Sequence, residues 1–215
     1  YKKFYKDNIL GSKNLFYSSH KYNPKIKLIF TNSSQIYKKK NGIVSENSKN
    51  IVAKNYTKYY TKFRIKFDKF MLNQKVNYTS LVLFNHDSVY RNKKFLFIRL
   101  INAIKKKNIK FVNKILNQNI CGDFSHADDI CEGIYKIIVT NKKIKRLILS
   151  SNKCTSLNNI IKYIIKKNKI DLKLNFKSKI KSKCLKGNNS LAKKIIKWKP
   201  KKNTFIAADE IYKCL

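Results

Sequence analysis

The 215-residue sequence has few residues that break or crosslink regular structure, with five glycines, two prolines and five cysteines. It contains no apolar run of about 20 residues, which a membrane span requires, and its apolar runs, such as 81–84 and 147–149, have the length of strands. The first residues, YKKFYKDNILG, lack the continuous apolar core of a signal peptide, and residue 1 is not Met. We therefore expect a cytoplasmic protein without a membrane partner, whose sequence here lacks its beginning.

The cysteines include no CxxC pair, so the usual sequence signature of a zinc site is absent. They are Cys121, Cys131, Cys154, Cys184 and Cys214. In a reducing cytoplasm such cysteines stay as thiols. The sequence predicts five free, mostly buried thiols and no metal site.

Negative charge is scarce, with 11 acidic residues against 50 basic ones and a formal net charge of +39. Such an excess is typical of proteins that bind nucleic acid or anionic membranes. Only four of the basic residues are arginine and 46 are lysine, spread over every segment, whereas phosphate and base recognition favours the arginine fork. We interpret the excess as coding bias toward AT-rich codons and expect no specific nucleic-acid partner. A nucleic-acid binder stays an alternative, and it predicts an affinity that falls steeply with salt.

Apolar residues make up 43% of the chain, enough for a substantial core, and their spacing alternates between strand and helix periods. It predicts strands at 26–31, 79–84, 110–112 and 146–150. It predicts helices at 10–20, 56–71, 95–106, 128–140, 156–167, 190–196 and 205–214. This alternation favours an α/β fold with a mainly parallel sheet.

Polar segments follow the first two predicted strands, where ligands sit in such sheets: NSSQIY at 32–37 and NHDSVYR at 85–91. The first segment and the start of the next helix place Ser33 and Tyr56 near one crevice. A phenol serves as a proton carrier when a neighbouring cation lowers its pKa. A capping serine and a packed tyrosine are the alternative. The lysine- and aromatic-rich helix that follows is either an RNA platform or, as we favour, a core helix.

These segments resemble motifs of the GDP-mannose 4,6-dehydratase family, which are extended short-chain dehydrogenases/reductases. TNSSQIY resembles STSELYG, and LVLFNHDSVYR is similar to ILFNHESPRRG. DFSHADDICEGIY, Thr155-Ser156-Leu157 and GNNSLAKKIIKWKP resemble RDWGHAKDYVEAMW, YSV and GDxTKAKxKLxWKP in the same order, and DNILGSKNLF resembles an earlier DxxGTLRLL. The matches span nearly the whole chain.

The resemblance implies a Rossmann-type doubly wound parallel sheet with a smaller α/β substrate domain. Residues 1–86 and 124–151 would belong to the NADP-binding domain, and residues 87–123 and 152–215 to the nucleotide-sugar-binding domain. The first βαβ units, with their glycine-rich phosphate-binding turn, would precede Tyr1. The family also implies a homo-oligomer, either a dimer or a tetramer.

The catalytic positions implied by the resemblance are Ser33, Gln35 and Tyr56, in place of the family's Thr, Glu and Tyr. The family's Lys falls on Tyr60. Arg64 could replace that Lys only if Tyr60 were the active tyrosine, a register we disfavour because it shortens the distance to Asn85 by four residues.

The remaining positions concern ligand binding. For the NADP cofactor, the resemblance implies Tyr60, His86 and Arg91. For a GDP-mannose-type nucleotide sugar, it implies Asn85, Arg99, Asn117 and Gly122, where Arg99 stands for a Lys and Gly122 for an Arg of the family. A glycine cannot replace the charge-assisted contact of a guanidinium with a diphosphate.

The resemblance implies a lyase that converts GDP-mannose to GDP-4-keto-6-deoxymannose, the first step toward GDP-fucose. A hydride leaves C4 while Tyr takes the hydroxyl proton, Glu then removes the C5 proton and helps the C6 hydroxyl leave, and the hydride returns to C6. The amide of Gln35 is no base at neutral pH. Two alternatives therefore stay open: a catalytically eroded relative that serves as a binding or assembly module, and a different NAD(P)-dependent sugar-nucleotide epimerase/dehydratase.

Overall fold

A three-stranded parallel sheet lies at the centre of the computed structural model, which describes residues 2–37, 41–55, 57–74, 76–175 and 183–215. Its strands are ordered β1-β3-β7, with bounds Leu28–Ser33, Tyr78–Leu83 and Arg146–Leu149. Ile29 pairs with Thr79, and Leu81 pairs with Leu147. The sequence expectation of an α/β fold with a parallel sheet is confirmed.

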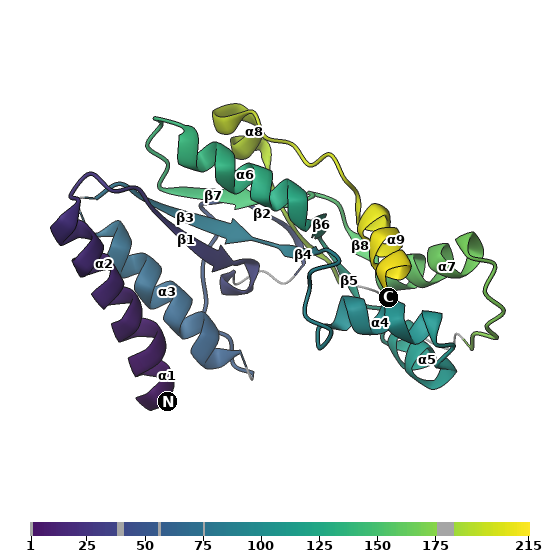
Figure 1. Ribbon diagram of the computed structural model, residues 1–215. Helices are drawn as coiled ribbons and strands as arrows, with labels where there is room; N and C mark the ends of the chain where they lie inside the picture. The colour runs from purple at the N-terminus through teal and green to yellow at the C-terminus, as the bar shows by residue number, and fades with distance from the viewer. Residues whose placement is uncertain (1, 38–40, 56, 75, 176–182) are drawn as a thin grey trace.

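Helices cover both faces of this sheet (Figure 1). One face packs on an aromatic cluster that includes Phe16, Phe63 and Phe67, so the aromatic-rich helix is a core helix. The other face packs on a cluster that includes Ile137 and Trp198. The helices of the first face are α1 (Lys2–Phe4), the π-helix η1 (Tyr5–Leu10), α2 (Gly11–Tyr22) and α3 (Lys58–Leu72), and those of the second are α6 (Ala127–Val139) and α8 (Ser190–Ile196).

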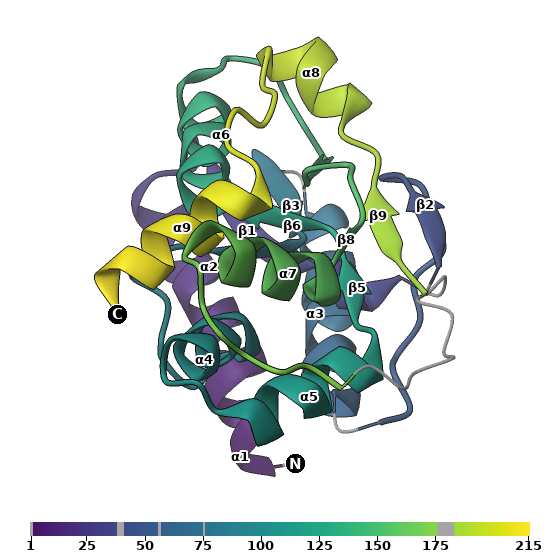
Figure 2. The same cartoon turned by 90° about the vertical axis from the view of Figure 1, so that its right-hand side faces the viewer.

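A second group of helices packs together beyond the carboxyl ends of the strands, and Figure 2 shows it in front. It comprises α4 (Leu96–Lys105), α5 (Ile109–Gln118), α7 (Leu157–Lys167) and α9 (Thr204–Cys214). Its own core includes Leu100, Ile104, Leu116 and Ile160, each at most 2% exposed. The two-domain division stays a prediction, although Trp198, which it assigns to the second domain, packs against the central sheet.

Three short strand pairs connect the two regions. β2 (Gly42–Val44) pairs in parallel with β9 (Leu185–Gly187), and β4 (Asn85–Asp87) in parallel with β6 (Phe124–His126). β5 (Cys121–Gly122) pairs antiparallel with β8 (Thr155–Ser156). No helix among the described residues has the length and apolar character needed to cross a bilayer.

The buried carboxylate of Asp123 holds three of these segments together. It accepts hydrogen bonds from the backbone N–H of Ser151 at 2.8 Å, of Asn152 at 3.1 Å and of Gly187 at 3.1 Å, and from the Ser151 hydroxyl at 2.6 Å. Burial raises the pKa of Asp123, and these four donors oppose that shift. The contacts fix β9 and the chain after β7 relative to the segment between β5 and β6.

Two sequence expectations are wrong. Residues 110–112 lie in α5 and not in a strand, because Val112, Ile115 and Leu116 form one buried helical face and Asn108 caps the helix by accepting from the Phe111 N–H at 3.1 Å. The cysteines are not five free, mostly buried thiols either.

Cys154 and Cys184 form a disulfide, with Cα atoms 6.1 Å apart. Cys121 is half-buried, whereas Cys131 and Cys214 are exposed on α6 and α9. The expectation failed because neither the solvent-facing side of these helices nor the approach of residues 154 and 184 is visible in cysteine spacing.

Candidate functional site

A cavity of about 920 Å³ opens at the carboxyl ends of β1 and β3. Six of the predicted site residues line it: Ser33, Gln35, Tyr60, Asn85, His86 and Arg91. They come from the end of β1, the short 3-10 helix that follows it, the first turn of α3, β4 and the loop after β4. The predicted catalytic Tyr56 lies outside the described residues.

Ser33 reaches the cavity at the point where β1 ends and the 3-10 helix η2 (Ser34–Ile36) begins. Its hydroxyl accepts from the backbone N–H of Gln35 at 3.3 Å and thus caps η2. The capping interpretation of Ser33 is therefore confirmed, while its place on the cavity wall keeps its second lone pair and its proton near a ligand.

Tyr60 and Arg64 lie one turn apart on α3, and both line the cavity. The Arg64 guanidinium lies over the Tyr60 ring, 4.7 Å from its centroid, and 5.2 Å from the centroid of Phe30. Burial lowers the pKa of Arg64, and its buried Nε has no hydrogen-bond partner among the described residues. The site thus holds a partly desolvated cation with a free donor.

His86 lies on β4, and its Nδ1 is 2.9 Å from the Phe84 carbonyl. Because a carbonyl only accepts, Nδ1 carries a proton and Nε2 is the acceptor of the neutral ring. Burial lowers the pKa of His86, and the nearby charge of Arg91 lowers it further. The ring is therefore neutral at pH 7.

Arg91 is the second guanidinium of the cavity. Its Nε lies 3.6 Å from Oδ1 of Asp87, and its guanidinium carbon Cζ lies 3.7 Å from the centroid of the Phe95 ring. At 3.6 Å the ion pair is too long for a hydrogen bond, and both atoms are buried without one among the described residues. Burial raises the pKa of Asp87 to about 6, and Arg91 only partly opposes this shift.

A model of the NAD dependent epimerase/dehydratase family matches residues 1–148. The chain belongs to this family. Among curated proteins, no sequence match is found.

Solved structures of low sequence identity share the fold of this epimerase/dehydratase chain. UDP-glucuronic acid 4-epimerase from Bacillus cereus, in complex with NAD, is 18% identical with a TM-score of 0.72, over 92% of this chain and 65% of that one. RMD from Pseudomonas aeruginosa, complexed with NADPH, is 12% identical with a TM-score of 0.75, over 95% and 71%. dTDP-glucose 4,6-dehydratase from Bacillus anthracis, in complex with NAD, is 13% identical with a TM-score of 0.73, over 92% and 64%. The chain thus spans slightly under two thirds of the first of these proteins.

The family implies a nicotinamide cofactor, and the cavity fits a group that carries phosphate. Arg64 and Arg91 each present a buried Nε without a protein acceptor among the described residues. Buried donors of this kind are costly unless an acceptor satisfies them, and phosphate oxygens accept strongly from guanidinium. These two arginines would hold the anionic groups of a dinucleotide.

Three predicted substrate residues do not line this cavity. Arg99 is exposed on α4, with its guanidinium 5.0 Å from the Phe111 ring centroid. Asn117, on α5, donates to the carbonyls of Asn113 at 2.9 Å and Asn175 at 3.2 Å. Each of the two lies in the second group of helices rather than at the strand ends.

Gly122 adjoins a residue of the cavity wall. A Cβ atom at Gly122 would stand 3.0 Å from the Phe124 ring and 3.2 Å from Nδ2 of Asn85. Since Asn85 lines the cavity, Gly122 adjoins its wall, and a side chain at this position would have to displace that amide.

Sequence reasoning missed Asp87 as part of the site and set Arg64 aside. Asp87 was detectable, since it stands four residues before Arg91 in the polar segment after the second strand. The register with Tyr60 and Arg64 was disfavoured because it shortens the distance along the chain to Asn85. Arg64 nevertheless lines the cavity, beside Tyr60, which stands at the family's Lys position.

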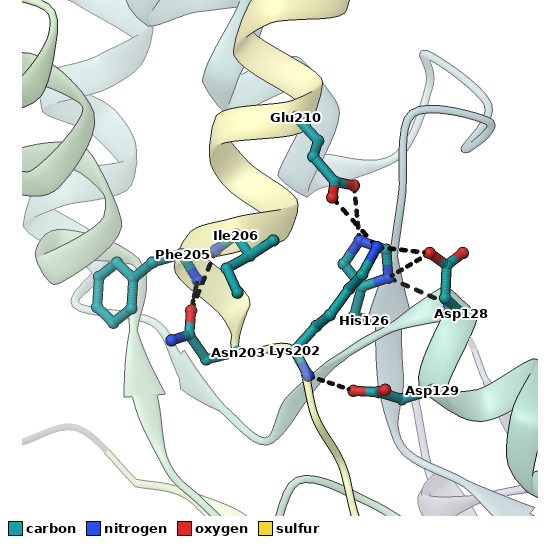
Figure 3. A network of polar contacts seen from close by, with 8 residues as sticks. All are labelled: His126, Asp128, Asp129, Lys202, Asn203, Phe205, Ile206 and Glu210. Carbon is teal, nitrogen blue, oxygen red and sulfur yellow. Dashed lines mark hydrogen bonds and ion pairs between the residues drawn. The ribbon is translucent and has the colours of Figure 1, made fainter.

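The DFSHADD motif (123–129) takes part in a polar network that connects α6 to α9 (Figure 3). None of its residues lines the cavity. The buried His126 ring accepts the Asp128 N–H at Nδ1, at 3.1 Å, and contacts Glu210 through Nε2, at 2.7 Å. The ring tautomer with its proton on Nε2 satisfies both contacts. Lys202 adds ion pairs to Asp128 at 2.7 Å and to Glu210 at 3.3 Å. The network anchors α9, and with it the second helix group, to the central sheet.

Proposed function

We propose that this chain forms the catalytic and nucleotide-sugar-binding part of an NADP-dependent GDP-mannose 4,6-dehydratase, a lyase that converts GDP-mannose to GDP-4-keto-6-deoxymannose. The observation that carries the proposal is the convergence of Ser33, Gln35, Asn85, His86 and Arg91 on one cavity at the strand ends. These residues come from the two segments that resemble the dehydratase motifs. Other family members use the same fold for other nucleotide sugars, so the choice of GDP-mannose rests on the motif resemblance alone.

Each residue has a role that its chemistry permits. The cofactor supplies the hydride acceptor and donor when it is bound. Ser33 would hold the hexose hydroxyl through its free lone pair, and Tyr56 would take that hydroxyl proton. Arg91 would bind a cofactor phosphate, and the neutral His86 would offer Nε2 as an acceptor. Asn85 at the cavity would orient the sugar nucleotide by its amide.

The nucleotide end of the substrate would extend toward the second helix group. Arg99 is an exposed cation there, Asn117 lies on α5 of that group, and Gly122 adjoins Asn85. We further propose a cytoplasmic homo-oligomer, a dimer or a tetramer, with no specific nucleic-acid partner.

Gln35 limits the activity of this site. It lines the cavity at the position of the family's Glu, but an amide cannot take the C5 proton at neutral pH. General acid–base groups typically contribute about 100- to 10,000-fold each. We expect turnover by the unmodified protein to be slower than in a relative with Glu by a factor in this range.

Two alternatives follow from specific residues. Gln35 and Tyr60, at the Glu and Lys positions, also fit an eroded relative that binds cofactor without turnover and acts as a binding or assembly module. Gly122, in place of the family's Arg, also fits an epimerase or dehydratase that acts on another sugar nucleotide, because glycine lacks the guanidinium that would pair with the diphosphate.

A gain-of-function experiment separates these possibilities. NADP binding and formation of 4-keto-6-deoxy product from GDP-mannose are measured for the protein that contains this chain and for its Gln35→Glu variant. We expect cofactor binding by both, and product formation at least about 100-fold faster in the variant. The matched control is Gln74→Glu, the same change at a residue that donates to the Phe70 carbonyl on the last turn of α3 and does not line the cavity.

Each outcome assigns the site differently. Binding without turnover in either protein supports the eroded relative. Turnover of a uridine or thymidine nucleotide sugar in preference to GDP-mannose supports another epimerase or dehydratase. A protein that binds no nicotinamide cofactor, or a gain equally large in Gln74→Glu, overturns the proposal.

A further inference from the structure

Three cysteines from distant parts of the chain meet outside the candidate active site. Cys121 is on β5, Cys154 directly precedes β8, and Cys184 directly precedes β9. Their sulfur atoms all lie within 4.8 Å of one another. Cys184 is 9% exposed, Cys121 is half-buried, and Cys154 is exposed, so the group is open to solvent on one side.

The backbone positions of these cysteines are fixed without the disulfide between Cys154 and Cys184. The antiparallel pairing of β5 with β8 holds Cys121 beside the segment of Cys154. The Cys184 carbonyl accepts from the Gly42 N–H at 2.8 Å, and its own N–H donates to Oδ1 of Asn41 at 3.2 Å. Asp123, two residues after Cys121, also holds the Gly187 N–H at 3.1 Å. Opening the disulfide therefore leaves three sulfurs held in one place.

Three converging sulfurs are a ligand set for a soft metal cation, because thiolates select Zn²⁺ and Cu⁺ over hard cations. Zinc–sulfur bonds of about 2.3 Å in a tetrahedral site place the sulfurs about 3.8 Å apart. Opening the disulfide lets the sulfurs of Cys154 and Cys184 move apart to that separation, and the Cys121 sulfur already lies within 4.8 Å of both. The exposed side at Cys154 leaves a fourth position that water can fill.

We propose that the reduced forms of Cys121, Cys154 and Cys184 together bind one thiophilic cation of the Zn²⁺ class. The cation would clamp β5, β8 and β9 to one another beside the Asp123 contacts. The disulfide and the metal use the same sulfurs, so the oxidised pair and the metal-bound trio exclude each other.

The charge of the surroundings suits such a complex. Three thiolates and one Zn²⁺ carry a net charge of −1, and the exposed Lys153 and Lys183 directly precede two of the ligands in a chain of net charge +39. Cations close to thiolates favour the ionised form. A lysine-rich surface therefore stabilises a site whose own charge is negative.

Reduction of the disulfide precedes metal binding. A dithiol reductant donates two electrons and two protons to the Cys154–Cys184 disulfide, which gives two thiols, while the reductant closes to a cyclic disulfide. The three thiols then release their protons to the buffer as the S–metal bonds form. The cation keeps its oxidation state.

The test uses the full chain, reduced with a phosphine and freed from metal, and titrates it with Co²⁺ followed by Zn²⁺. We expect about one equivalent of Co²⁺ to bind, with thiolate-to-cobalt absorption in the near ultraviolet, and Zn²⁺ to abolish that absorption. Cys121→Ser, Cys154→Ser and Cys184→Ser should each weaken binding at least about tenfold. The matched controls are Cys131→Ser and Cys214→Ser, which remove exposed thiols of α6 and α9.

A second measurement does not depend on the folding of variants. In the reduced natural chain, Zn²⁺ should protect residues 121, 154 and 184 from alkylation by iodoacetamide and leave residues 131 and 214 reactive, as peptide mass spectrometry would report. The absence of saturable Co²⁺ binding, equal losses in the control variants, or alkylation of all five cysteines at equal rates with and without Zn²⁺ would overturn the proposal.

Discussion

Replacing Asp87 by asparagine removes a buried carboxyl group. The charge of Arg91 offsets only part of the desolvation cost of its ionised form. Asp87 is 7% exposed, and Arg91 is 3.6 Å away without a hydrogen bond. Burial raises its pKa from 3.8 to about 6. One pKa unit corresponds to about 1.4 kcal/mol, so the ionised carboxylate costs the folded state about 3 kcal/mol.

The sign of the pH dependence follows from this raised pKa. The folded state binds the Asp87 proton more tightly than the unfolded state, so the stability that the protonated group contributes is present below about pH 4. It is lost as the pH rises through about 6, at about 1.4 kcal/mol per pH unit relative to a variant that cannot ionise. Asp87→Asn should therefore match the natural protein near pH 4 and be about 3 kcal/mol more stable at pH 8.

Urea unfolding at several pH values between 4 and 8 measures this difference, and the subtraction cancels the contribution of the general positive charge. Asp171→Asn, at an exposed carboxyl group, removes the same charge and serves as the control. A stability difference that does not change with pH, or the same slope in the control, would refute the reasoning.

Three further predictions concern packing and hydrogen bonds. Gly187→Ala would bring a Cβ to 2.6 Å from the Phe84 ring and should lower the free energy of unfolding by about 1–3 kcal/mol in urea unfolding; an unchanged value would show that β9 can shift. Asp123→Asn keeps the side-chain shape but turns an amide NH₂ toward two backbone donors, which should cost about 2–6 kcal/mol by the same assay; a loss under 1 kcal/mol would contradict these contacts. Asn203→Ala removes the N-cap of α9 and should cost about 1 kcal/mol, seen as a lower Tm, whereas Asn203→Asp should retain the cap.

The elements with a long, regular apolar pattern were predictable from the sequence. The helix predicted at 128–140 is α6, Ala127–Val139, and the strand predicted at 79–84 is β3, Tyr78–Leu83. In α6 one buried face repeats at the helical period, whereas β3 is a short run that is buried along nearly its whole length. The apolar group at 110–112 was too short to distinguish a strand from part of a helix, and the Asn108 cap decided in favour of the helix.

The candidate site was partly predictable for a topological reason. Parallel strands bring their carboxyl ends to one edge, so polar segments after β1 and β3 were expected to meet, and they line one cavity. Contacts that depend on three-dimensional packing alone were not predictable. The His126–Glu210 contact joins residues 84 positions apart, and no local pattern in either segment indicates it.

The pairing of β2 with β9 has a consequence for the order in which the protein acquires its structure. Gly42 pairs with Leu185, so β2 has no partner until a further 143 residues have left the ribosome. At about 5–20 residues per second, this wait lasts roughly 7–30 s. During synthesis, Ile43 and Val44 therefore depend on local contacts or on chaperones for shielding. Slow codons or pauses between the codons of these two strands would lengthen that interval.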